Sequence, residues 1–169
     1  MRTTGPARRG FSRALVRAPI LAYRCGLGVL LGGRFVLLTH VGRTTGSPRQ
    51  VVLEVVGRGE APGSYLVASG YGARAQWFRN VLAHPEVSYQ VGRCRRDGWA
   101  YPLPSAESGR RLADYARRHP RTAAALMAMV GHDIDGSPAA YERLGADAEH
   151  GVPLVLLSPP PAPPGAGDP

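Results

Sequence analysis

Two short stretches of the sequence gather glycines, hydroxyls and arginines at points where an apolar strand pattern ends. The first, the hairpin loop, is residues 42–49 (GRTTGSPR), between strand patterns at 36–41 and 51–56. The second, the strand–helix segment, is residues 69–80 (SGYGARAQWFRN), which opens a helix. Backbone N–H groups at a helix start favour negative charge, and residues 70–81 contain no acidic side chain. The two stretches predict a cradle for a phosphate or another oxyanion.

The hairpin loop offers several donors around a backbone that a ligand can approach closely. The guanidinium groups and hydroxyls belong to Arg43, Thr44, Thr45, Ser47 and Arg49. Gly42 and Gly46 carry no side chain that would hold a ligand at a distance. Such a set can bind a phosphate from several sides. The same residue types are common in ordinary turns, so a plain turn stays open for this stretch taken alone.

The strand–helix segment places Gly70, Tyr71 and Gly72 just before a helix. Arg74 and Gln76 stand near the helix start, where they are well placed to face a ligand. Trp77 has Val81 one helical turn later, a spacing typical of a packed core residue.

Composition limits the chemistry that these stretches can perform. All 21 basic residues are arginines, so lysine Schiff-base chemistry is excluded. The formal net charge of +9 favours an anionic partner without identifying it. Cys25 and Cys94 lack metal-ligand spacing, so no metal site is predicted, and a disulfide between them stays open. A chain of 169 residues is expected to form one main domain.

The chain divides into three predicted regions. Residues 1–33 form a basic, amphipathic helix that packs on the domain or contacts a membrane surface peripherally. Residues 34–158 form the main domain, and residues 159–169 are a proline-rich, disordered tail. The absence of a convincing signal peptide or membrane span predicts a cytoplasmic protein.

Six short strands are predicted, with one helix between the third and the fourth. The strand patterns lie at 34–41, 49–56, 65–69, 87–91, 94–101 and 152–157, and the helix patterns at 75–83, 106–118, 121–130 and 138–144. The early connections are too short for parallel crossovers. The pattern therefore predicts an α+β fold, a mostly antiparallel six-stranded barrel with helices packed on its outside.

At these motifs the chain resembles the deazaflavin-dependent nitroreductase family of actinobacteria. The resemblance covers residues 34–91 and the closing strand, and it is carried by LTHVGRTTGSPR, VASGYG, QWFRNV and the His84–Pro85 pair. It implies a split β-barrel, often a homodimer, that binds coenzyme F420 and reduces a small-molecule substrate by hydride transfer. The expected substrates are activated alkenes, enones, quinones or nitro compounds.

The resemblance also implies roles for individual residues. On the phosphate side it points to Arg43, Thr45, Gly46 and Arg49. Near the deazaflavin it points to Ala68, Ser69, Gly70, Gln76 and Trp77. Thr44, Tyr71, Gly72 and Arg74 complete the predicted coenzyme site. Several family members have a basic residue where this chain has Thr44, so one anion contact is expected to be missing.

Two residues are predicted as proton donors. His40 lies at the end of the first strand pattern, just before the hairpin loop, and Tyr71 lies within the strand–helix segment. A structural role remains the alternative for each.

Three other functions compete with the deazaflavin hypothesis. One is a split-barrel reductase that uses FMN instead of F420. Another is a barrel that binds a cofactor or a membrane without catalysis. Nucleic-acid binding is disfavoured, because the chain lacks the aromatic and basic sheet face that single-strand binders use.

Overall fold

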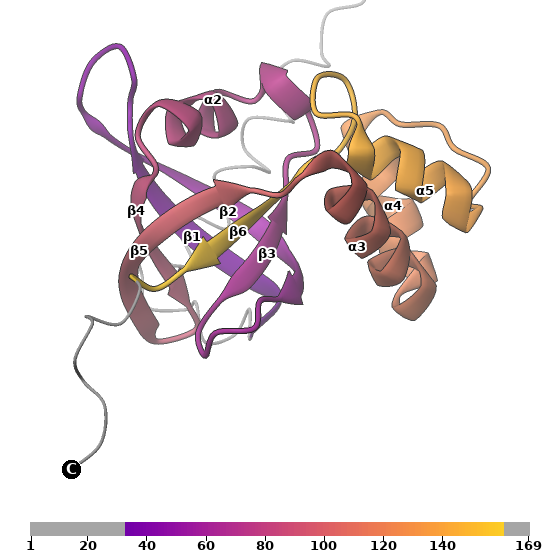
Figure 1. The fold of residues 1–169 in the computed structure, drawn as a ribbon, viewed down its shortest axis with the longest axis horizontal. Helices are drawn as coiled ribbons and strands as arrows, with labels where there is room; N and C mark the ends of the chain where they lie inside the picture. The colour runs from indigo at the N-terminus through magenta and orange to yellow at the C-terminus, as the bar shows by residue number, and fades with distance from the viewer. Residues whose placement is uncertain (1–32, 161–169) are drawn as a thin grey trace, which may run out of the picture.

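The first strand opens with four consecutive apolar residues, Phe35 to Leu38, and three of them are buried. A computed structural model describes residues 33–160 (Figure 1). In β1, Val36 and Leu38 point inward and are fully buried. They meet Val67, Tyr89 and inward residues of the other strands, which together fill the barrel.

Six antiparallel strands close into a barrel, as the sequence predicts. They are β1 (Phe35–Val41), β2 (Pro48–Arg58), β3 (Tyr65–Ala68), β4 (Glu86–Val91), β5 (Cys94–Pro102) and β6 (Leu154–Ser158). Their order around the barrel is β1-β2-β3-β6-β5-β4, and the pairing of β4 with β1 closes it. Closure removes the free strand edges.

Strand β2 is longer than the pattern over 49–56 predicts. It continues to Arg58 because a register shift against β3 between Val55 and Gly57 accommodates the glycine within the strand. Such a bulge adds a residue without ending the pairing. Gly57, which the sequence indicates as the start of a turn, therefore lies in β2.

The helices lie in two places. The helix α2 (Gln76–Ala83) follows the 3-10 turn η2 (Gly72–Arg74) and lies over one end of the barrel, close to the hairpin loop (Figure 1). The other three pack together beside the barrel: α3 (Ser105–Arg118), α4 (Pro120–Val130) and α5 (Pro138–Ala146). Their second apolar cluster includes Leu112, Met127 and Tyr141 and reaches Val56 and Leu154 of the barrel.

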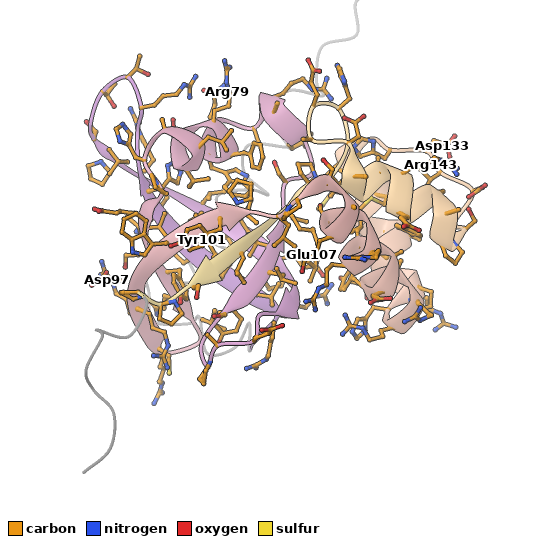
Figure 2. All side chains as sticks on the ribbon, viewed as in Figure 1. Arg79, Asp97, Tyr101, Glu107, Asp133 and Arg143 are labelled. Carbon is orange, nitrogen blue, oxygen red and sulfur yellow. The ribbon has the colours of Figure 1, made fainter. Side chains whose placement is uncertain are left out.

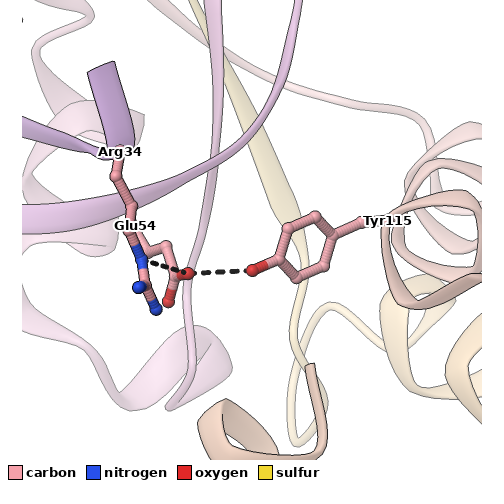
Figure 3. A network of polar contacts seen from close by, with 3 residues as sticks. All are labelled: Arg34, Glu54 and Tyr115. Carbon is pink, nitrogen blue, oxygen red and sulfur yellow. Dashed lines mark hydrogen bonds and ion pairs between the residues drawn. The ribbon is translucent and has the colours of Figure 1, made fainter. Parts of the chain in front are cut away.

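A partly buried carboxylate attaches α3 to the barrel (Figure 3). The hydroxyl of Tyr115 donates to Glu54 Oε1 at 2.8 Å, and Arg34 Nε lies 3.4 Å from the same oxygen. Burial, the hydrogen bond to Glu54 and its negative charge all raise the pKa of Tyr115. The charge of Glu54 is thus compensated by Arg34 and solvated by a protein hydroxyl.

The predicted N-terminal helix and most of the predicted C-terminal tail lie outside the described residues. None of the helices within residues 33–160 combines the length and the apolar character needed to cross a bilayer.

Candidate functional site

One arginine joins the hairpin loop to the strand–helix segment. Arg43 Nη1 donates to Gln76 Oε1 at 3.0 Å and to Asn80 Oδ1 at 2.9 Å. The backbone N–H of Arg43 donates to the same Asn80 oxygen at 3.2 Å. The residues joined are 33 and 37 positions apart in the sequence. The two predicted stretches therefore form one site at the α2 end of the barrel.

The hairpin loop is held by its own backbone. Gly42 donates its N–H to Ser47 O at 2.9 Å, and Gly46 donates to Gly42 O at 2.8 Å. Thr45 Oγ1 accepts from the N–H of Ser47 at 3.3 Å. Gly46 has a φ of +65°, a conformation that strongly favours glycine. The loop is fixed in shape, and Thr44, Ser47 and Arg49 are exposed on it.

Residues of the strand–helix segment divide into a buried support and an exposed surface. Ser69 is fully buried, and its hydroxyl donates to Gly72 O at 3.1 Å. Gly72 has a φ of +51°, and a Cβ there would lie 2.5 Å from Glu149 O. The backbone of residues 69–72 is consequently pressed against the loop before β6, which leaves Tyr71 54% exposed.

Asn80 links Arg43 to a buried histidine. Its Nδ2 lies 3.2 Å from His40 Nδ1, and an amide nitrogen can only donate, so Nδ1 accepts and is unprotonated. Burial lowers the pKa of His40 below its ordinary value of 6.5; a backbone hydrogen bond at Val41 opposes this, and the charge of Arg49 adds to it. His40 is therefore neutral at pH 7, and it is 4% exposed.

The structure places the predicted coenzyme residues at three depths. The exposed ones are Thr44, Thr45, Gly46, Arg49, Tyr71, Arg74 and Gln76. The half-buried ones are Arg43, Ala68 and Gly70. The buried ones are Ser69, Gly72 and Trp77. Trp77 packs edge-on against Phe78 in the barrel core, as its spacing indicates. The exposed set forms the accessible face of the site.

The electrostatics of this face favour an anion. Within residues 33–160 no carboxylate pairs with Arg43, whose side-chain partners are the neutral amides of Gln76 and Asn80. No side chain caps the N-terminus of α2, and its first turn contains no acidic residue. The guanidinium charge and the positive end of the helix thus act together without neutralisation.

A second wall approaches the site from α4. A Cβ on Gly70 would lie 2.5 Å from Val130 Cγ1, so the two segments are in tight contact. His132 Nε2 lies 3.3 Å from Gly70 O. The C-terminal end of α4 and His132 just beyond it therefore support the strand–helix segment at Gly70.

Asn80 and His132 were not among the site residues predicted from the sequence. Asn80 belongs to the QWFRNV motif, and a polar residue one turn after Gln76 is the signal that could have indicated it, since both lie on one helix face. His132 gives no such signal, because its contact depends on how α4 packs.

The described residues form two hollows. One, of about 590 Å³, lies between β2, β3 and the C-terminal half of α3, away from this face. The other, of about 430 Å³, lies over β1, β4 and β5 and is lined by His40, by Trp99 and by Pro48 of the hairpin loop. Neither is lined by residues of the strand–helix segment. The site itself is an open, donor-rich face.

The structure is thus a closed antiparallel barrel with an arginine at one end whose side-chain partners are neutral amides. The family profile described as F420H(2)-dependent quinone reductase matches residues 21–133, more than half of the chain. The chain belongs to this family. It is an oxidoreductase whose reductant is F420H2, which confirms the resemblance drawn from the motifs. A comparison with curated proteins gave no match.

Two solved structures share the fold, and a third is similar in sequence. A protein of unknown function from Agrobacterium tumefaciens has a TM-score of 0.51 and 18% identity, covering 85% of this chain and 55% of that one. A conserved hypothetical protein from Mycobacterium tuberculosis has a TM-score of 0.50 and 14% identity, covering 82% and 80%. An F420-H2 dependent reductase, FDR-A, has a TM-score of 0.43 and 25% identity, covering 74% and 94%.

The residues present fit a phosphate-bearing coenzyme. The exposed face supplies guanidinium and hydroxyl donors, and no described carboxylate opposes them at Arg43. Donors of this kind bind phosphate oxygens by charge-assisted hydrogen bonds. The fit rests on the donor set and on the uncapped start of α2.

Proposed function

We propose that this reductase passes a hydride from F420H2 to a quinone or to another activated acceptor, such as an enone, an activated alkene or a nitro compound. The observation that supports this most directly is the Arg43 contact with Gln76 and Asn80, which presents a charged donor without a counter-ion. When bound, the reduced coenzyme supplies the hydride from C5 of its deazaflavin ring. The protein contributes binding, orientation and exclusion of water.

The hairpin loop is proposed to hold the coenzyme's phosphate. Arg43 and Arg49 provide guanidinium donors, Thr44 and Thr45 provide hydroxyl donors, and Gly46 leaves open space beside the backbone. Because the loop's backbone is already hydrogen-bonded, little conformational entropy is lost when a ligand binds. Thr44 is uncharged, so this site forms one ion pair fewer than relatives with a basic residue there.

The strand–helix segment is proposed to face the ring. Ala68, Gly70 and Gln76 are accessible or half-buried, whereas Ser69, Gly72 and Trp77 act from behind by fixing the segment. Ser69 does so through its bond to Gly72 O, and Trp77 through its packing in the barrel. Position is the main contribution of such residues, since small displacements of reacting groups are costly.

Tyr71 and His40 are the proposed proton donors, and their surroundings differ. The Tyr71 side chain is 54% exposed, so its hydroxyl can reach a substrate at the face. His40 is buried and its Nδ1 accepts from Asn80, so a proton could leave only from Nε2. We favour Tyr71 as the donor and assign His40 the positioning of Asn80.

The substrate wall is proposed to come from the end of α4. Val130 touches the Gly70 position, and the preceding Met129 is 66% exposed. A flexible, polarizable side chain at such a wall suits a planar apolar acceptor.

Coenzyme titration tests the proposed site. Purified protein is titrated with F420 and, separately, with FMN, and binding is followed by fluorescence. We expect F420 to bind, and Arg43→Ala to weaken binding at least tenfold, about 1.4 kcal/mol, because a charge-assisted contact is lost. The matched control is Arg79→Ala. Arg79 lies on the same helix as Gln76, and the Arg79 side chain points away from the barrel (Figure 2).

Tight FMN binding without F420 binding would favour the FMN-dependent alternative. Equal losses of F420 affinity in Arg43→Ala and Arg79→Ala would show that overall charge, and not the position of Arg43, determines the affinity. Steady-state reduction of a soluble quinone, a nitroaromatic and an enone by F420H2 then ranks the substrate classes.

A homodimer is also proposed. Trp99 and Tyr101 stack on the outside of β5 with ring centroids 6.4 Å apart, and Tyr101 is 45% exposed (Figure 2). Aromatic side chains are enriched in protein interfaces. Light scattering after gel filtration measures the mass directly, and Tyr101→Glu should shift it toward the monomer. Peripheral membrane contact of residues 1–33 and a cytoplasmic location stay predictions.

A further inference from the structure

A second anion site is suggested by the hollow between the barrel and α3. Its volume is about 590 Å³, within the range of small-molecule pockets. Its floor is apolar and includes Val56 and Leu66, both buried. Its rim carries the arginines Arg58, Arg111, Arg117 and Arg118 together with His119.

The rim has more positive charge than its carboxylates can neutralise. Asp114 is the only acidic residue that lines the hollow, and its Oδ1 already lies 2.9 Å from Arg117. Arg111 lies 3.4 Å from Glu107, outside the hollow. Neither Arg58 nor Arg118 has a carboxylate within ion-pair distance in the described part of the chain. Two guanidinium groups therefore remain free for a ligand.

These two side chains are partly held in position. The Arg58 guanidinium lies 5.4 Å from the centre of the Tyr65 ring, a cation–π contact at the edge of the hollow. Arg118 Nε donates to Asp114 O at 3.2 Å, which leaves its terminal nitrogens free. Tyr115 lines the hollow, but its hydroxyl points to Glu54 (Figure 3). Apart from Asp114, which is paired with Arg117, the charged groups of the hollow are thus cationic, and its floor is apolar.

The hollow is distinct from the coenzyme face. The hairpin loop joins the N-terminal end of β2, whereas Val55–Arg58 at its other end line the hollow. Seven to ten strand residues correspond to roughly 23–33 Å along the strand. One ligand of ordinary size does not span both places.

We propose that this hollow binds a small amphipathic anion, one with a phosphate or carboxylate head and an apolar body. The head would meet Arg58 and Arg118, and the body would cover Val55, Val56 and Leu66. Residues 1–32 are a poor electrostatic partner for the rim, because they contain six arginines and no acidic residue.

Calorimetric titration of the full chain with dodecyl phosphate, below its micelle-forming concentration, tests this site. We expect one molecule to bind per chain, with inorganic phosphate and a neutral dodecyl glycoside each binding at least tenfold more weakly. Arg58→Gln and Arg118→Gln should each weaken binding about tenfold. Arg110→Gln is the matched control, since Arg110 is exposed on α3 and does not line the hollow.

Several results would overturn the assignment. These are no binding, equal losses in all three variants, competition with F420, or a loss caused by Arg43→Ala. Binding to anionic phospholipid vesicles without binding to monomeric dodecyl phosphate would indicate a membrane contact instead. Thermal unfolding of each variant shows whether the fold is intact, and because Arg58 and Arg118 are exposed, little change is expected.

Discussion

Replacing Asn80 by aspartate should reverse the pH dependence that His40 gives to stability. The substitution keeps the shape of the side chain and the acceptor for Arg43, which lies 2.9 Å away. It replaces the amide that faces His40 Nδ1 at 3.2 Å with a carboxylate oxygen. A carboxylate cannot donate, so the ring bonds to it only when Nδ1 carries a proton.

The two proteins should therefore respond to pH with opposite signs. In the native protein the pKa of His40 is below 6.5, so the unfolded chain binds a proton first as the pH falls. The contribution of neutral His40 to the free energy of unfolding is full above pH 6.5, and it is lost as the pH falls through the pKa of His40 in the folded protein. In Asn80→Asp the contacting carboxylate should raise the pKa by about 1–3 units, about 1.4 kcal/mol for each.

In Asn80→Asp, the pKa of His40 in the folded protein should exceed its pKa in the unfolded chain. The contribution of protonated His40 to stability is then full below the unfolded-state pKa, and it is lost as the pH rises through the folded-state pKa. NMR titration of the imidazole measures the pKa, and urea unfolding from about pH 5 to about pH 8 measures stability across the range in which histidine titrates. His40→Gln in both backgrounds is the control, because it removes the titrating ring and keeps an amide. A His40 pKa that is unchanged or lower in Asn80→Asp would refute the assigned contact.

Three further substitutions test the scaffold. Tyr115→Phe removes the donor to the partly buried Glu54 and should lower the free energy of unfolding in urea by about 1–3 kcal/mol. Because the folded Tyr115 pKa is raised, its contribution is lost as the pH rises above 10.0, and the variant should lose less stability there; identical alkaline profiles would contradict this. Gly70→Ala should cost about 1–3 kcal/mol in urea unfolding through the clash with Val130, and Val130→Ala should relieve part of that cost; strictly additive effects would exclude the clash. Ser108→Ala removes a buried hydroxyl that bonds one backbone carbonyl at 2.6 Å and one backbone amide at 2.9 Å, so a loss of about 2–4 kcal/mol in thermal unfolding is expected, and a neutral effect would show that water replaces it.

The barrel could be predicted from the sequence because local patterns determine it. The apolar run at the start of β1 matches its buried segment, and the short connections between early strands allow only antiparallel pairing. The end of β2 could not be predicted in the same way. Gly57 is a typical turn residue, and only its pairing with Leu66 of β3 shows that it lies in a bulge.

The site could be predicted only in part. Glycines and arginines indicated where the two stretches lie, but not which side chain joins them. The partnership of Arg43 with Asn80 spans 37 residues and depends on how α2 rests on the barrel end. His40 shows the same limit, because its neutrality follows from burial and from the Asn80 amide, neither of which a strand pattern contains.

The fold treats two of its arginines in different ways, and the difference supports a binding role for one of them. Arg34 lies 3.4 Å from a carboxylate that is itself 11% exposed, so its charge is compensated within the protein (Figure 3). Arg43 is held as firmly, by hydrogen bonds of 2.9 and 3.0 Å, but both acceptors are neutral amides. Amides fix the direction of a guanidinium without cancelling its charge, whereas a carboxylate does both. An arginine with a purely structural role does not need neutral amide partners. An arginine that attracts an anionic coenzyme needs them, because they hold the guanidinium in place and leave its charge uncompensated.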